Sequence, residues 1–268
     1  MIATAIDGTR LHYRVAGSGP PIVLVGGKTS TIEGAWWRYV PVLAQELRVI
    51  ALDNRGTGES DRPDIPYSTA MLADDALTVL RACGEDSAHW FGLSLGGMIV
   101  QQVALRHPAA VRSMILAATH CGGADGTGSS DEASLPRDNP LARYGKLYAR
   151  SFLLEHPDWV AEDARHFGKM PLFAIHRQDQ AVRNHRTCER LSEISAPALV
   201  IHGQQDRMVP VERARELGTG LANAELRVLD HAGHQVHSEK FEQVVTLVLA
   251  FVARVEEARR AAPKPPAR

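Results

Sequence analysis

The stretch AHWFGLSLGG, residues 88–97, decides the fold of this chain. Its first half is apolar and predicts a buried strand, and the segment that follows, up to His107, predicts a helix. Ser94 then lies on an abrupt strand-to-helix turn, where a Cβ atom at Gly92 or Gly96 would collide with the neighbouring strand or helix. The pattern therefore predicts a nucleophile elbow with Ser94 as the nucleophile.

The same turn favours a negative charge next to Ser94. The backbone N–H of Leu95 lies at the beginning of the predicted helix, where unpaired N–H groups and the helix dipole stabilise an anion. We therefore expect Leu95 to provide one half of an oxyanion hole, the pair of donors that stabilises the charged oxygen of an acyl-transfer intermediate.

Apolar runs alternate with helical patterns along most of the chain. Residues 4–15 alternate polar and apolar side chains around Asp7-Gly8, which predicts an antiparallel hairpin. Further strands are predicted at residues 21–25, 48–52, 88–91, 111–118, 197–201 and 225–229. Helices are predicted at residues 36–47, 69–82, 95–107, 211–217 and 241–255. This order predicts a parallel sheet in a single α/β domain, for which 268 residues with 44% hydrophobic side chains suffice.

Residues 121–194 interrupt the alternation. They begin with a linker rich in Gly, Ser and Asp at 122–131 and continue with helical-looking pieces that contain no predicted strand. An insertion of this length between sheet strands is usually functional. We expect a core formed by residues 1–120 and 195–256, a helical cap formed by the insertion, and a disordered tail at 257–268.

Composition excludes several classes of partner. A net charge of −1 gives no overall field that would attract nucleic acid, and the longest apolar stretch, 244–253, is too short to span a bilayer. The N-terminus lacks the basic and apolar regions of a secretion signal. Cys83, Cys121 and Cys188 are odd in number and widely spaced, which predicts neither a disulfide framework nor a metal site. We expect a cytoplasmic protein in a reducing compartment, without nucleic-acid or membrane partners, and leave its oligomeric state open.

A serine hydroxyl is a poor nucleophile unless a base takes its proton and a carboxylate orients that base. Asp206 follows the predicted strand at 197–201, and His234 follows the last predicted strand. Ser94, Asp206 and His234 occur in one of the chain orders known for such triads. If Asp206 is only a turn residue, the alternative acid is Asp125, which follows the preceding strand.

The remaining histidines have simpler explanations. His231 and His237 are expected to be solvated surface residues, and His120 is equally consistent with a pocket wall and with packing. The histidines are too scattered along the chain to predict a metal site. The loop at residues 53–60 is expected to be structural, with Arg55 bonding locally.

Four motifs together resemble the α/β-hydrolase superfamily: GLSLG at 92–96, DNRGTGES at 53–60, HGQQD at 202–206 and the Gly-His pair at 233–234. Within it, the chain is similar to small bacterial esterases, enol-lactonases and cofactor-free haloperoxidases over nearly all of residues 1–256. The resemblance implies the α/β-hydrolase fold: a mostly parallel eight-stranded sheet with helices on both faces and an inserted helical cap. Such a fold specifies the substrate much less than the architecture.

The chain departs from this family pattern at Gly26-Gly27, where most relatives carry His-Gly, so the His side chain that braces the loop is missing. The Gly-Gly pair is similar to the arrangement in anthracycline methyl-ester hydrolases. The resemblance implies that the second oxyanion donor is the backbone N–H of Lys28, a role that a main-chain group fills whatever its side chain. The Lys28 ammonium either points into water or attracts a substrate carboxylate.

The cap covers the elbow in this arrangement and is expected to set substrate size. Its aromatic side chains form either the core of the cap or the wall of a substrate pocket. The candidate pocket residues of cap and core together are Gly27, Trp36, His120, Phe152, Trp159 and Phe173.

The sequence therefore predicts a serine hydrolase of carboxylic esters or lactones. Ser94 attacks the acyl carbon, His234 takes and returns the proton, Asp206 orients His234, and the backbone N–H groups of Leu95 and Lys28 stabilise the oxyanion. We expect a small-molecule ester or lactone as the partner, and neither a metal ion nor an organic cofactor. Two alternatives stay open: haloperoxidase or perhydrolase chemistry, in which peroxide replaces water on the same acyl-enzyme, and a ligand-sensing receptor without catalysis.

Overall fold

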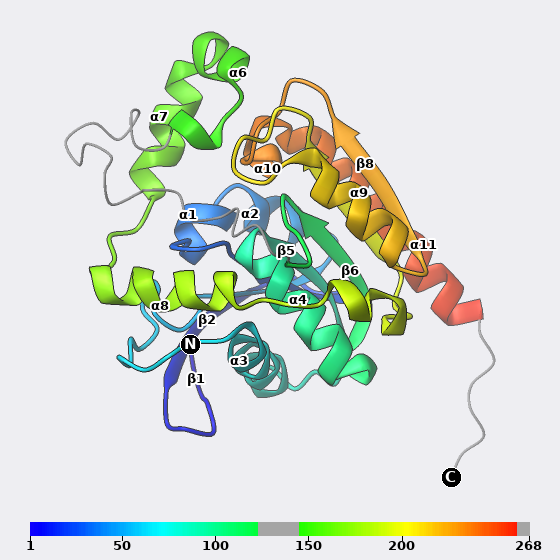
Figure 1. Ribbon diagram of the computed structural model, residues 1–268. Helices are drawn as coiled ribbons and strands as arrows, with labels where there is room; N and C mark the ends of the chain where they lie inside the picture. Colours follow the sequence, from blue (N-terminus) through cyan, green and yellow to red (C-terminus); the bar gives the residue numbers. More distant parts are fainter. Residues whose placement is uncertain (123–144, 262–268) are drawn as a thin grey trace.

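The structure is a computed structural model that describes residues 1–122 and 145–261. Within these residues one eight-stranded sheet forms, with the strand order β1-β2-β4-β3-β5-β6-β7-β8 (Figure 1). Its strands are β1 Ile2–Thr4, β2 Arg10–Ala16, β3 Pro21–Val25, β4 Arg48–Leu52, β5 Ala88–Leu93, β6 Val111–Ala117, β7 Ala198–Gly203 and β8 Ala224–Leu229. β1, β2 and β4 pair antiparallel, and every pair from β4 to β8 is parallel. The predicted fold is therefore confirmed.

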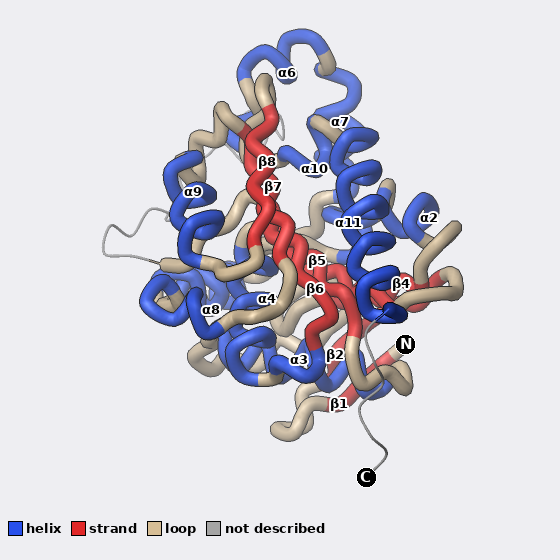
Figure 2. Tube along the Cα trace, turned by 90° about the vertical axis from the view of Figure 1, so that its right-hand side faces the viewer, coloured by secondary structure: helices blue, strands red, loops and turns tan. Residues whose placement is uncertain are grey.

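Helices cover both faces of the sheet, which explains why every residue of β3, β5 and β7 is buried. Figure 2 shows α2 and α11 on one face and α3, α4 and α9 on the other, and each face has its own apolar cluster. The elements around the sheet are α2 Tyr39–Leu43, α3 Thr69–Ala82, α4 Leu95–Arg106, η1 Pro108–Ala110, α9 Val211–Gly220, α10 Val236–Glu239 and α11 Phe241–Ala261. Since parallel strands end at the same edge, the loops after β3, β5, β7 and β8 meet there.

The predicted helix at residues 36–47 is wrong, because the structure has two short helices in that region. α1 (Ile32–Trp36) begins after Thr31, whose hydroxyl accepts a hydrogen bond from the Gly34 N–H. α2 begins three residues after α1 ends and carries Pro41 in its first turn. In one continuous helix Pro41 would lie in the interior, where it has no N–H to donate and its ring clashes with the preceding turn.

The described part of the cap is helical. Its elements are η3 Gly145–Leu147, α6 Arg150–Glu155, α7 Pro157–His166, α8 Leu172–Arg183 and η4 Cys188–Glu193. A single β-bridge joins Gly122 to Arg186, so the two ends of the cap lie side by side. Figure 1 shows α6 and α7 at the upper end of the molecule and α8 further down. Asp125 lies outside the described residues.

The C-terminal helix is longer than predicted. α11 continues to Ala261 instead of ending at residue 255, so residues 257–261 are helical and not a disordered tail. Residues 262–268 lie outside the described part of the chain. Among the helices of the described residues, none is long and apolar enough to cross a membrane.

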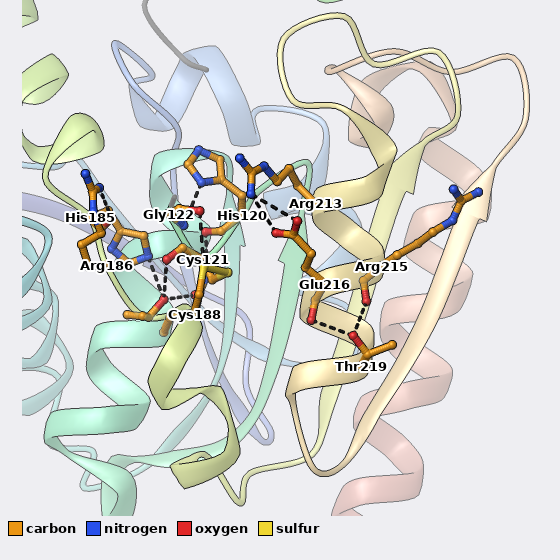
Figure 3. The surroundings of a disulfide bond; sticks show 12 residues. His120, Cys121, Gly122, His185, Arg186, Cys188, Arg213, Arg215, Glu216 and Thr219 are labelled. Carbon is orange, nitrogen blue, oxygen red and sulfur yellow. Dashed lines mark hydrogen bonds and ion pairs between the residues drawn. A yellow bond between two sulfur atoms is a disulfide. The ribbon is translucent and has the colours of Figure 1, made fainter. Parts of the chain in front are cut away.

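The cysteine prediction is wrong for two of the three residues. Cys121 follows β6 and Cys188 begins η4, and a disulfide joins them across a sequence separation of 67 (Figure 3). Wide spacing says nothing about such a pair, because the fold returns the end of the cap to its beginning. Cys83 is a free, partly buried thiol. The cysteine count therefore provides no argument for a reducing compartment.

Arg55 also differs from its prediction, since its bonds are not local. The buried guanidinium makes a bidentate pair with Asp75 in α3 and a further hydrogen bond, of 2.7 Å, to Asp7 in the β1–β2 turn. Burial opposes the charge of Arg55, but the bonds to Asp75 and Asp7 outweigh it and raise the pKa of the guanidinium. The loop after β4 is thus structural, as expected, but it ties the hairpin to α3.

Candidate active site

Ser94 lies on the strand-to-helix turn that the sequence predicts. β5 ends one residue before it and α4 begins one residue after it, and Ser94 has φ 51°, in the left-handed region that non-glycine residues rarely adopt. A Cβ atom at Gly92 would lie 2.4 Å from the backbone oxygen of Gly96, and one at Gly96 would lie 2.0 Å from that of Val25. Both glycines are therefore required for β5, α4 and β3 to pack this closely.

The structure brings Ser94, His234 and Asp206 into one hydrogen-bonded array, which we call the Ser–His–Asp array. The Nε2 atom of His234 is 3.1 Å from the Ser94 Oγ, and its Nδ1 is 2.8 Å from the Asp206 Oδ2. With the proton on Nδ1 donated to the carboxylate, Nε2 is left to accept the serine proton. The array therefore has the polarity that general-base activation of a hydroxyl requires.

Asp206 is held as an anion by donors on both of its oxygens. Oδ1 accepts hydrogen bonds from the N–H groups of Met208 and Val209, at 2.8 and 2.9 Å. Oδ2 faces the Nε2 of His202 at 3.2 Å in addition to His234. Burial would raise the pKa of Asp206, but the electrostatic interaction with His234 and the bonds from both histidines outweigh it and hold this pKa well below its usual range.

Glu239 holds the histidine loop in place, and sequence reasoning did not identify it. Its Oε1 accepts the N–H of Gly233, the residue before His234, and its Oε2 accepts the N–H of Ala149 at the start of α6, both at 2.8 Å. Burial raises the pKa of Glu239 to about 7, although the two backbone bonds act in the opposite direction. Its partners are Gly233, six residues before it, and Ala149, 90 residues before it, so the sequence around Glu239 does not mark this role.

The loop after β3 reaches the nucleophile. A Cβ atom at Gly27 would lie 3.3 Å from the Ser94 Cβ and 3.3 Å from the Leu93 backbone oxygen, so only glycine fits without displacing the elbow. The segments that carry the two expected oxyanion donors, Leu95 and Lys28, therefore meet at Ser94.

The Lys28 side chain does not point into water. Its Nζ donates a hydrogen bond of 2.9 Å to the Oδ1 of Asp179 in α8, and both side chains are largely buried. Of the two alternatives that the sequence left open, a Lys28 side chain in water is therefore excluded. Since Asp179 already balances the ammonium charge, Lys28 is also less suited to attract a substrate carboxylate.

Two of the candidate pocket residues pack inside the core and the cap. Trp36 is fully buried, and its ring contacts those of Phe91 and His237; a Cβ atom at Gly26 would lie 3.7 Å from its Nε1. Phe152 stacks on Tyr148 in a small cluster inside the cap. Both side chains therefore take part in apolar packing, Trp36 in the core and Phe152 in the cap.

Trp159 and Phe173 lie on different surfaces of the cap. Trp159 donates its Nε1 proton to the Ser238 Oγ at 2.8 Å, and its ring lies under the Arg38 guanidinium. Ser238 is four residues beyond His234, so Trp159 connects α7 to the segment that carries the histidine. Phe173 in α8 is 37% exposed.

Two histidines beside the array are buried and electrically neutral. His120 accepts a hydrogen bond from the Gly122 N–H, and burial lowers the pKa of His120 to about 4, which favours packing over a pocket role. His237, predicted at the surface, is 3% exposed between the rings of Trp36 and Tyr39, and burial lowers its pKa to about 3. The prediction failed because α10 turns His237 inward. His231 is exposed, as expected.

The family described as "alpha/beta hydrolase fold" matches residues 20–241 of the chain. The chain belongs to this family and is a hydrolase of the α/β fold. Among its relatives, a proposed carbamate hydrolase of Variovorax paradoxus, RutD, is 34% identical over 91% of this chain and 97% of its own length. Among solved structures, Est816, an N-acyl homoserine lactone degrading enzyme, has a TM-score of 0.81 at 29% identity and covers 94% of this chain and 100% of that one. An enol-lactonase from Burkholderia xenovorans has a TM-score of 0.84 at 25% identity and covers 94% and 99%.

Proposed function

We propose that this protein hydrolyses carboxylic esters or lactones through an acyl-enzyme on Ser94. The observation that carries the proposal is the continuous hydrogen-bonded array from the Ser94 Oγ through His234 to Asp206. It lies at the beginning of a helix whose first N–H groups have no acceptor within the helix. A nucleophile, a base, an orienting acid and an anion site thus meet at one point.

The proposed reaction has two halves. The Ser94 Oγ attacks the acyl carbon as His234 Nε2 takes its proton, and the N–H groups of Leu95 and Lys28 stabilise the charged oxygen. The tetrahedral intermediate collapses, and His234 returns the proton to the departing alkoxide. Water then attacks the acyl-enzyme with His234 again as base, which releases the acid and restores Ser94. Asp206 holds the Nδ1–H of His234 throughout and stays ionised.

Carbamates are the second candidate substrate class. A carbamate also has a carbonyl carbon bonded to a leaving group, so the same array can act on it, and the relative RutD supports this class. The lactone-degrading relatives Est816 and the enol-lactonase support lactones. Turnover of matched p-nitrophenyl esters and carbamates, beside an N-acyl homoserine lactone, distinguishes these classes.

Labelling of the protein by a fluorophosphonate tests the mechanism independently of the substrate. We expect Ser94 to be labelled, and esters or lactones to be turned over faster than carbamates. Faster carbamate turnover would replace the proposed substrate class with the second one. Labelling without turnover of any substrate would favour the ligand-sensing receptor, and product formation that depends on added peroxide would favour perhydrolase chemistry.

A further inference from the structure

The loop that is expected to carry the second oxyanion donor, residues 26–30, has an unfavourable backbone conformation. Thr29, next to Lys28, has φ 63°, a left-handed conformation that is costly for a β-branched residue. The core holds the beginning of the loop through the Asn54 side chain, which donates to the Gly26 carbonyl at 3.0 Å. The part of the loop around Thr29 therefore requires further contacts that hold it in this conformation.

These contacts come from α8 of the cap. The Gln178 Oε1 accepts the Thr29 N–H at 2.8 Å, and its Nε2 donates to the Arg55 carbonyl at 3.2 Å. Gln178 is fully buried, so water does not compete for these bonds. The next residue, Asp179, accepts the hydrogen bond from the Lys28 ammonium. Two consecutive residues of α8 therefore hold two consecutive residues of the loop.

We propose that Gln178 is a positioning residue for the oxyanion hole, through which the docked cap fixes the direction of the Lys28 backbone N–H. This inference rests on the proposed function, because it assumes that this N–H stabilises the reacting oxygen. An amide is suited to the task, since its oxygen takes the Thr29 N–H while its nitrogen is anchored on the loop after β4. Gln178 thus supplies from the cap the support that the Gly26-Gly27 sequence does not provide.

A single substitution tests the support. Gln178→Met keeps the size of the side chain and removes both hydrogen bonds. Because loss of an oxyanion donor lowers kcat by about 10²–10³-fold, we expect displacement of one to lower kcat on p-nitrophenyl acetate by about 10–100-fold, with KM changed less than about threefold. Gln180→Met is the matched control, since Gln180 lies on the same helix but is exposed. It should leave kcat and KM unchanged.

Hydrogen exchange of the peptide that covers residues 26–32 provides a readout independent of catalysis. Exchange should be faster in Gln178→Met than in the wild type and unchanged in Gln180→Met. Unchanged exchange in Gln178→Met would overturn the inference, and so would faster exchange with kcat intact. Faster exchange in a protein whose wild type hydrolyses no ester would uphold the support by Gln178 and reject the proposed function instead.

If Gln178→Met does not fold, a second variant at the same position tests the proposal. Gln178→Glu keeps the acceptor for the Thr29 N–H but places a carboxylate oxygen against the Arg55 carbonyl. We expect a loss of kcat of about 3–10-fold with KM unchanged, since only one of the two bonds remains. Wild-type kcat in this variant, with a normally folded protein by circular dichroism, would contradict the proposal.

Discussion

Ser94 is the residue whose removal should have the largest effect on activity. Ser94→Ala deletes the nucleophile but keeps a small side chain on the turn, so we expect kcat to fall by up to about 10⁶-fold with little change in thermal stability. Ester hydrolysis and fluorophosphonate labelling both measure this. The His89–Ser113 pair, joined at 2.7 Å in the buried sheet, offers a control, because Ser113→Ala should leave both signals intact. Retention of more than a few per cent of activity in Ser94→Ala would reject the assignment.

We expect Asp206 to contribute to catalysis by holding His234 in the tautomer that carries its proton on Nδ1. Asp206→Asn keeps the shape of the side chain but presents an amide that can donate to Nδ1, which moves the imidazole proton to Nε2, and we expect kcat to fall roughly 10⁴-fold. Steady-state kinetics of Asp206→Asn beside Asp125→Asn measures this. The second substitution should cost little. If the two penalties were reversed, Asp125 would be the triad acid.

Because Glu239 ionises, we expect the free energy of unfolding to fall as pH rises. Its pKa is raised from 4.5 to about 7 in the folded protein, so between these values the folded state binds more protons than the unfolded state. The contribution of Glu239 is therefore fully present below about pH 4.5 and is lost as pH passes 7, by roughly 3 kcal/mol in total. Urea unfolding of wild type and Glu239→Gln at pH 5, 6, 7 and 8 measures it.

The Gln variant lacks this titration, so the stability of the wild type relative to the variant should fall with rising pH. A constant difference would show that burial does not control Glu239. The two backbone bonds from Gly233 and Ala149 would then balance the effect of burial on its pKa.

At the level of elements, α7 should influence which substrates are accepted. Trp159 links α7 to Ser238 and to the Arg38 side chain, near the segment that carries His234. We expect Trp159→Ala to change kcat/KM unequally across p-nitrophenyl esters of increasing acyl length, because the cap shapes the pocket. A uniform loss for all chain lengths would indicate lost stability and exclude a pocket role.

Strands were predicted more accurately than helices. Pro21–Val25 and Arg48–Leu52 match their predicted bounds because a strand buried on both faces needs an unbroken apolar run, which is a local property. The helix at 36–47 failed because apolar spacing alone does not weigh the effect of one interior proline, Pro41. For the cap, the sequence predicted a helical region but not the bounds of its individual helices.

At the level of the whole molecule, the Cys121–Cys188 disulfide should stabilise the fold. It closes a loop that spans 67 residues, for which the chain-entropy estimate is about 4 kcal/mol, with typical values of 2–4 kcal/mol. Thermal unfolding with and without dithiothreitol measures this. Reductant should lower the Tm of the wild type and leave that of the Cys121→Ser/Cys188→Ser variant unchanged. An equal response of both proteins would show that the bond does not contribute.

The sequence sufficed to predict the members of the Ser–His–Asp array, because each of them follows a recognisable strand, and Ser94 and His234 lie within two residues of a glycine. It did not suffice for residues that act across the fold. Gln178 contacts Thr29, and Glu239 contacts Ala149, at sequence separations of 149 and 90. Glu239 also accepts the N–H of Gly233, six residues away, but the contacts of both side chains with the distant segments form only when sheet and cap assemble.

The position of the disulfide has a consequence for how the substrate range of this protein can change. Since the cap leaves the sheet beside Cys121 and returns beside Cys188, it forms a closed cassette with both ends at one place on the scaffold. Such a cassette can be exchanged, in evolution or in the laboratory, without changing the register of any strand in the sheet. Only an incoming cap whose α8 equivalent still reaches Thr29 would keep the oxyanion loop in position. Among the described residues, an exchanged cap would therefore have to preserve Gln178 and Asp179 at the oxyanion loop, and the contact of Trp159 with Ser238 beside His234.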